Sequence, residues 1–505
     1  MREGKEGLKL FNVRYLPLFA AFLILGVFCV KVSITVAAIL WIVAAFLSAA
    51  LFVTKRVGRV IAIALVLTMF LGYGAARLDL YLRNEVGLAG TAEIACRVTS
   101  VTEVTTETDE GDEVTYKVKA DRLKSGKAYG GGISFETDVP LRTGDRVTAY
   151  GYVYIQKLSL ESFFQALNYR KGCKYALSDP EILLVTTGKA PLSDRIKEGA
   201  RNILTKHQGE RAGAFAYATL FGDTDYMFEE DKSSMREVGV AHVFAISGLH
   251  IGVLSGVLLF LLRKFRVKDG VSLLVLLPIF GFYAYLSGFT PSVLRASIMV
   301  CVGLAASHFG ARYDGISSLS LAAILLLLAR PLFLFDLSFV MSFLAIFGLQ
   351  SLTTPFKQAF VRRGVKEKLA EALALSLSTT LALVPISAVV FGRITLVGFL
   401  LNIVVVPLAS ASYILSLVGL LLTAVFSNFG ALLSAVSILP AAIIALSTAV
   451  ASLGLTAKYA FSTPEILVYY ATLGLVGKYS LASKKVKLVA GGIGAGVLGI
   501  LIFAV

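Results

Sequence analysis

Long apolar runs without charge recur along this 505-residue chain, and they restrict its fold more than any other feature. A run of roughly 20 such residues can cross the hydrocarbon core of a bilayer as an α-helix. Inside that core every backbone N–H and C=O group must be bonded within the protein, so only helices and closed barrels cross it. Three runs precede residue 77 and about ten follow residue 241, which predicts a polytopic α-helical protein of about thirteen spans.

The charge distribution predicts an orientation in the membrane. The net charge is +15, and basic loops between apolar runs occur at residues 55–59, 263–268, 357–368 and 478–487. Because lysine and arginine are enriched in cytoplasmic loops, we expect these loops and the N-terminus on the inner side of the cytoplasmic membrane. This orientation explains the positive charge of the loops without a nucleic-acid-binding surface. Residues 77–200 are placed outside the cell.

The segment after the first three spans has the composition of a small β-domain. Apolar and polar residues alternate around Ile94–Val98, Val114–Val118 and Val147–Val153, with glycine-containing turns between them. This alternation is typical of half-buried strands, and about five of them in roughly 100 residues favour a small β-barrel. The predicted domains are a three-span module, the extracytoplasmic β-domain, a helical connector and a large membrane domain, at residues 1–76, 77–190, 191–240 and 241–505.

The sequence AHVFAISGLHIG, residues 241–252, places polar groups at the start of a predicted span. On one helix His242, Ser247 and His250 would share a side. Three interpretations stay open. They could line a hydrated path or a proton-sensitive gate. Ser247 could be a nucleophile with His250 as its base. They could instead bond between helices, with Gly248 allowing close packing.

Two charged residues occur in later apolar segments. Arg295 follows Pro291 by one turn, so it either reaches the membrane interface or requires a partner or a water-filled channel. Asp336 begins another span, where a carboxylate could cap the helix. It could alternatively pair with Arg295.

The β-domain and the segment after it alternate basic and aromatic residues. Aromatic rings beside cationic groups suit single-stranded nucleic acid, because bases stack on rings while cations bind phosphates. The alternative is a barrel core with solvated charges. The candidate DNA-binding residues are Arg146, Tyr152, Tyr154, Lys157, Tyr169, Arg170 and Lys171.

Cysteine usage and missing motifs restrict the chemistry. Cys96 and Cys173 both belong to the predicted outer domain, where oxidation is possible, so a Cys96–Cys173 disulfide is one hypothesis. The chain has no GxxxxGK[ST] phosphate loop, no HExxH motif and no CxxC motif. We therefore expect no metal, no cofactor and no ATPase activity of its own. Any transport needs a partner or a gradient to drive it.

Taken together, the motifs resemble those of the ComEC family, the inner-membrane DNA channel of natural transformation. The resemblance is carried by AHVFAISGLHIG, by TPSVLRASIM at 290–299, by the stretch at 310–343, and by Pro385, Asn402 and Pro407 in order. Residues 20–185 resemble the family's N-terminal module, which implies that the barrel is OB-like. One departure is Ser338-Phe339-Val340-Met341-Ser342, where the family often has Gly-Phe-Gln-Leu-Ser.

The resemblance implies a channel for single-stranded DNA, with an extracytoplasmic DNA receptor and a cytoplasmic ATPase or helicase motor as partners. Many relatives continue into a metallo-β-lactamase-like domain, which is not found in these 505 residues, so a separate nuclease is expected. The pore candidates are His242, Ser247, Gly248, His250, Arg295 and Asp336. The alternatives are a permease or channel for another substrate and, third, an intramembrane hydrolase that uses Ser247 and His250.

Overall fold

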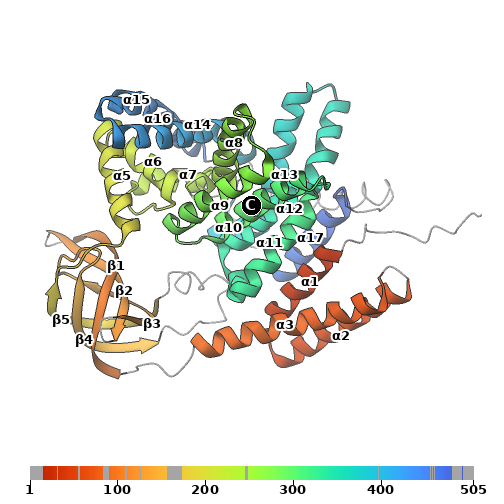
Figure 1. The fold of residues 1–505 in the computed structure, drawn as a ribbon, viewed down its shortest axis with the longest axis horizontal. Helices are drawn as coiled ribbons and strands as arrows, with labels where there is room; N and C mark the ends of the chain where they lie inside the picture. Colours follow the sequence, from red (N-terminus) through yellow and green to blue (C-terminus); the bar gives the residue numbers. More distant parts are fainter. Residues whose placement is uncertain are drawn as a thin grey trace, which may run out of the picture.

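The computed structural model describes residues 15–30, 32–54, 57–83, 90–108, 111–124, 127–155, 173–244, 248–395, 397–454, 456–457, 459, 461–479 and 492. It contains an N-terminal group of helices, a β-barrel, and a larger helical body reached through a connector (Figure 1).

The N-terminal helices are α1 (Tyr15–Phe28), α2 (Ile34–Val53) and α3 (Arg59–Arg83). The third predicted span ends at Ala76, whereas α3 continues to Arg83, because a helix can extend past its apolar part into a polar region. Ala20 and Leu23 of α1 pack against Leu326 and Leu327 of the later helix α11 (Gly315–Ala329). The N-terminal helices therefore pack on the larger body through α1.

Five strands form the barrel: β1 (Gly90–Thr108), β2 (Gly111–Lys124), β3 (Lys127–Thr137), β4 (Arg146–Ile155) and β5 (Cys173–Thr186). They close in the order β1-β2-β3-β5-β4, with β3 and β5 parallel and the other pairs antiparallel. Ile94, Cys96, Val147 and Val153 are buried inside, as the alternation predicts. The prediction of a small barrel is therefore confirmed.

Three helices connect the barrel with the rest: α5 (Leu192–Gln208), α6 (Glu210–Phe221) and α7 (Glu229–Glu237). Helix α6 is buried from Ala212 to Leu220. Arg211 Nε donates to Asp231 Oδ2 at 2.8 Å and fixes α6 to α7. The predicted connector is thus a packed part of the helical body rather than an extended linker.

The remaining chain is helical. It comprises α8 (Gly248–Lys264), α9 (Asp269–Leu286), α10 (Pro291–His308), α11, α12 (Leu337–Arg362), α13 (Glu367–Phe391), α14 (Gly398–Val425), α15 (Gly430–Val436), α16 (Ile438–Ala451) and α17 (Thr463–Val476). A short pairing of β6 (Ile394–Thr395) with β7 (Thr456–Ala457) joins the loops after α13 and α16.

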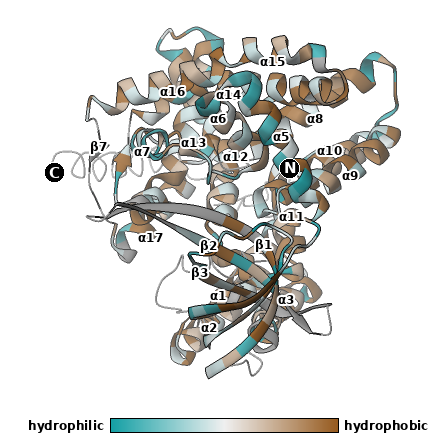
Figure 2. Ribbon diagram, turned by 90° about the vertical axis from the view of Figure 1, so that its left-hand side faces the viewer, coloured by the Kyte–Doolittle hydropathy of each residue, from teal (hydrophilic) through white to brown (hydrophobic). Residues whose placement is uncertain are grey.

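Eight segments within the described ranges are long and apolar enough to cross a membrane, and α1, α11 and the segment 465–476 are shorter apolar helices. Apolar residues colour most of α8, α9, α10, α14 and α15 (Figure 2). The chain is therefore a polytopic membrane protein, mostly helical. The last apolar run of the sequence, residues 488–505, is also predicted to be a span, but it falls almost wholly outside the described residues, so the count of about thirteen stays a prediction.

Candidate functional site

The segment 241–252 is not one continuous helix. His242 lies in the 3-10 turn η1 (Ala241–Val243), and α8 begins at Gly248. Ser247 lies outside the described residues, so its proposed roles remain untested. The prediction that His242 and His250 share a helical side is wrong, because His242 lies in the 3-10 turn η1 and His250 lies in the separate helix α8.

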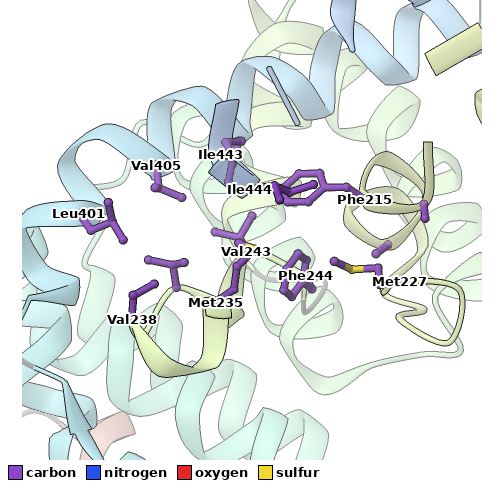
Figure 3. Packing of buried hydrophobic residues seen from close by; sticks show 14 residues of the cluster. Phe215, Met227, Met235, Val238, Val243, Phe244, Leu401, Val405, Ile443 and Ile444 are labelled. Carbon is purple, nitrogen blue, oxygen red and sulfur yellow. The ribbon is translucent and has the colours of Figure 1, made fainter. Parts of the chain in front are cut away.

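The apolar residues at the start of this segment pack inside the protein. Val243 and Phe244 join a buried cluster with Phe215 of α6 and Met235 of α7, and α14 and α16 complete it (Figure 3). The Phe215 and Phe244 rings meet edge to face, with centroids 5.4 Å apart. This part of the motif therefore packs the connector helices α6 and α7 against α14 and α16.

His250 lies in the first turn of α8 with only 2% of its surface exposed. Its ring is 4.7 Å from that of Tyr413 in α14, measured between centroids. Close by, the Tyr283 hydroxyl of α9 donates to the Leu220 carbonyl of α6 at 2.9 Å. His250 thus packs against α14, a helix in which the sequence analysis named no candidate site residue.

Helix α14 carries hydroxyl groups on the side that holds Tyr413. Ser412 and Ser416 are completely buried, and Gln208 Nε2 of α5 donates to Ser416 Oγ at 3.2 Å. Among the described residues, neither Gln208 Oε1 nor Ser412 Oγ has a hydrogen-bond partner. We refer to Gln208, His250, Ser412, Tyr413 and Ser416 as the polar cluster. The sequence could have indicated this cluster only through the spacing of Ser412 and Ser416, which are four residues apart. Gln208 is 208 residues from Ser416 in the chain, so no local pattern connects it with them.

Arg295 is buried in α10, with 3% of its surface exposed. Its Nε donates to Ser342 Oγ of α12 at 2.9 Å, and its Nη1 is 3.4 Å from Met299 Sδ. The guanidinium lies 6.0 Å from the centroid of the Phe343 ring. Nη2 lies against Gly248, where a Cβ atom would collide with it. The structure therefore brings together two residues that the sequence analysis selected separately.

Asp336 has the capping role that the sequence allows. Its Oδ1 accepts a hydrogen bond from the Ser338 backbone N–H at 2.7 Å, at the start of α12. None of the ion pairs among the described residues joins it to Arg295. The suggested Arg295–Asp336 pair is wrong, because the carboxylate is used by its own helix and the guanidinium by Ser342.

The DNA-binding candidates of the barrel are only partly described. Arg146 and Tyr152 project outward from β4, and 55% of the tyrosine is exposed. Tyr154 belongs to the same strand, but its side chain is not described. The candidates Lys157, Tyr169, Arg170 and Lys171 lie outside the described residues.

Cys96 is a free, buried cysteine, so the predicted disulfide with Cys173 is not formed in the structure. Cys96 lies on β1, which pairs with β2 and β4, whereas Cys173 begins β5, which pairs with β3 and β4. A disulfide requires Cα atoms within about 7 Å of each other. The sequence places both cysteines in one domain, but it does not show that their strands, β1 and β5, are separated by other strands.

No group of three or more His, Cys, Asp or Glu side chains that could hold a metal ion occurs in the described part of the chain. The polar residues collected at α8, α10, α12 and α14 are instead hydroxyl, amide, imidazole and guanidinium groups. Such groups can donate hydrogen bonds and, in the case of Arg295, bind an anion. Binding and guiding a polar substrate is the chemistry that they support.

A family model described as Competence protein matches residues 219–483, which is more than half of the chain. The chain belongs to this family. Its match with ComE operon protein 3 of Bacillus subtilis is 33% identical over 219 residues, covering 43% of this chain and 27% of the relative. Recombination protein 2 of Haemophilus influenzae is 28% identical over 252 residues, covering 47% of this chain and 32% of that protein.

The resemblance to ComEC-type competence proteins is thereby confirmed at the level of the family. The matched regions amount to about a third or less of the length of these two relatives. The family match runs from the end of α6 to just beyond α17, and it includes His250, Arg295 and Ser416 but not the barrel. No solved structure matches the chain significantly.

Proposed function

We propose that the chain conducts single-stranded DNA inward across the cytoplasmic membrane during natural transformation. The membership of the Competence protein family and the names of its relatives support this proposal. The helical body would provide the passage, and the barrel would receive the strand outside. The N-terminus and the basic loops would then lie in the cytoplasm, as the distribution of lysine and arginine predicts.

The observation that carries the proposal is the polar cluster within an apolar helical body. Gln208, Ser412 and Ser416 come from α5 and α14 and are buried, yet Gln208 Oε1 and Ser412 Oγ have no hydrogen-bond partner in the part of the chain that the structure describes. Unpaired polar atoms away from water are costly, so such groups in membrane helices usually face a water-filled cavity. We infer that this side of α14 faces a hydrated path when the protein conducts.

The barrel supports a role in receiving DNA. A closed barrel of five strands in the order β1-β2-β3-β5-β4 has the arrangement of an OB-fold, and we infer that it is one. OB-folds bind oligonucleotides with strands 2 and 3 and with the β1–β2 and β4–β5 loops. The second of these loops contains Lys157, Tyr169, Arg170 and Lys171. Arg146 and Tyr152 would extend the contact along β4.

We propose that the chain acts as a channel and not as an enzyme. The sequence contains no phosphate-loop motif, so a cytoplasmic ATPase or helicase, or an ion gradient, would supply the energy. An extracytoplasmic receptor would deliver the DNA, and a separate nuclease could remove the second strand. These partners are proposed from the family alone.

The test is uptake of fluorescently labelled DNA by a transformable strain whose own channel gene is deleted and replaced by this one. The wild-type chain should restore internal, nuclease-resistant signal. Gln208→Leu, which removes the amide from the polar cluster, should reduce it severalfold at equal protein level. Ser447→Ala is the matched control, since Ser447 is also buried but donates to the Ile443 carbonyl of its own helix at 2.8 Å. Failure of the wild type to restore uptake would reject the proposal.

A further inference from the structure

We propose that Arg295 and the start of α8 form a binding site for one phosphodiester group. This inference rests on the proposed function, because it assigns that group to the backbone of the conducted strand. We call Arg295, Gly248 and Ser342 the Arg295 site.

The Arg295 guanidinium is a buried charge without a compensating one. Ser342 Oγ and Met299 Sδ occupy Nε and Nη1, and both are uncharged. No carboxylate lies within 4.0 Å of the guanidinium in the described part of the chain. Burial of an unpaired charge is strongly unfavourable. An anion at this place would therefore lower the free energy of the native state.

The start of α8 adds positive potential at the same point. A helix N-terminus is equivalent to about half a positive charge, and it binds anions such as phosphate. The first turn of α8 contains no acidic residue. Gly248, its first residue, directly contacts Nη2 of Arg295, for which the described residues provide no hydrogen-bond acceptor. Two positive groups in contact favour a shared anion over an empty site.

Two further helices begin beside this point. Helices α10 and α12 start at Pro291 and Leu337, and Ser292 Oγ lies 3.2 Å from Ser338 Oγ in their first turns. Thr290, which precedes α10, is buried with its Oγ1 unpartnered. Asp336 contributes the one carboxylate at these helix starts, and it caps α12. The guanidinium of Arg295 and the helix starts therefore contribute more positive potential here than the single carboxylate of Asp336 offsets.

A singly charged phosphodiester fits this site better than a carboxylate or a nucleobase. Nη2 and the second N–H of Nη1 leave the end of the planar guanidinium with a pair of donors that matches two phosphate oxygens. A strand presents the same group at every nucleotide, so each phosphate could replace the one before it. Conduction requires binding that is favourable but weak enough for release. One arginine with one helix end meets that condition.

The experiment measures binding of a fluorescent thymidine oligonucleotide to the purified full chain in maltoside micelles, which contain no phosphate. The affinity for wild type should fall as salt rises, and Arg295→Gln should bind about tenfold more weakly with a salt slope reduced by about one. Arg295→Lys should lie between them, because it keeps the charge but not the fork. Arg330→Gln, an exposed arginine near the start of α12, is the matched control and should bind like wild type.

Competitors identify the source of the phosphate. An oligonucleotide with a neutral methylphosphonate backbone should not displace the probe from wild type, whereas an unlabelled phosphodiester strand should. Inorganic phosphate should compete only at high concentration. If micelles containing phosphatidylglycerol abolish the difference between wild type and Arg295→Gln, the site binds lipid headgroups and the assignment to DNA is wrong.

The outcomes separate this inference from the proposed function. Unchanged affinity and salt slope in Arg295→Gln and Arg295→Lys, with thermal unfolding like that of wild type, would overturn the site even if uptake in cells is normal. If the wild-type chain fails to support uptake but shows Arg295-dependent phosphodiester binding, the site stands and the proposed function fails. Should Arg295→Gln not fold, Arg295→Lys and Ser342→Ala carry the test.

Discussion

The Nη2 atom of Arg295 lies against Gly248, so that the second turn of α10 meets the first residue of α8 without a side chain between them. The sequence shows the glycine and the arginine in separate motifs, and the structure explains both together. Glycine is required at position 248 because any Cβ atom would occupy the space of the guanidinium.

Gly248→Ala should therefore displace Arg295 and weaken the α8–α10 contact. Overpacking of this kind typically costs about 1–3 kcal/mol. We expect a lower melting temperature in detergent and weaker oligonucleotide binding. Gly252→Ala is the control, because no atom lies within 4 Å of a Cβ at that position in the same helix. Equal melting temperatures for the two variants would contradict the close contact.

The polar cluster should be accessible to water in the conducting protein. In a background without native cysteines, Ser412→Cys and Ser416→Cys should react with a small water-soluble thiosulfonate reagent, and DNA should slow the reaction. Ser447→Cys should not react, because this serine in α16 is equally buried but is bonded within its own helix. Equal, slow labelling at all three positions would indicate a dry helix contact.

The barrel could be predicted because its strands have two different sides. Val147, Ala149 and Val153 point inward, while Arg146 and Tyr152 point outward, and this alternation is visible in the sequence. For the start of the 241–252 motif, the sequence could not show in the same way whether the residues face lipid or protein. An apolar run looks alike whether it contacts lipid or a protein core, and Val243 and Phe244 pack in a core.

The candidate site was predictable residue by residue but not as an arrangement. Arg295 and His250 were selected because charged and ionisable groups are costly in apolar helices. Their partners, Ser342 and Tyr413, are an ordinary serine and an ordinary tyrosine in distant spans. Gln208 was missed because nothing in a mixed-charge connector indicates that its amide reaches α14. Long-range packing decides such pairs, and one sequence does not encode it locally.

Asp223, in the loop between α6 and α7, should make stability depend on pH. Burial and the neighbouring Asp225 raise the pKa of Asp223 above its ordinary value. The native state then holds its proton to higher pH than the unfolded chain, so stability falls as pH rises from the unfolded pKa through the raised one. Asp223→Asn should be more stable than wild type at pH 7 and less dependent on pH. A melting temperature that falls in this variant at neutral pH would contradict the assignment.

The Cys96 thiol should be unreactive in the folded protein. Burial raises its pKa to about 12, so almost no thiolate is present at neutral pH, and the thiolate is the reactive form. Maleimide without reductant should label Cys96 only after denaturation, and mass spectrometry should find it as a free thiol. Recovery of a Cys96–Cys173 peptide pair joined by a disulfide would contradict the structure.

Tyr152 should contribute to DNA binding by the barrel if a base stacks on its exposed ring. Stacking of one base is worth about 1–3 kcal/mol, so Tyr152→Ala should weaken oligonucleotide binding about tenfold. Tyr152→Phe should retain the affinity, because the ring and not the hydroxyl would carry the contact. Leu184→Ala, at an exposed position of the neighbouring strand β5, tests whether any apolar loss from the barrel surface has the same effect. Binding that is unchanged in Tyr152→Ala would move the DNA contact away from β4, toward the β2–β3 side of the barrel.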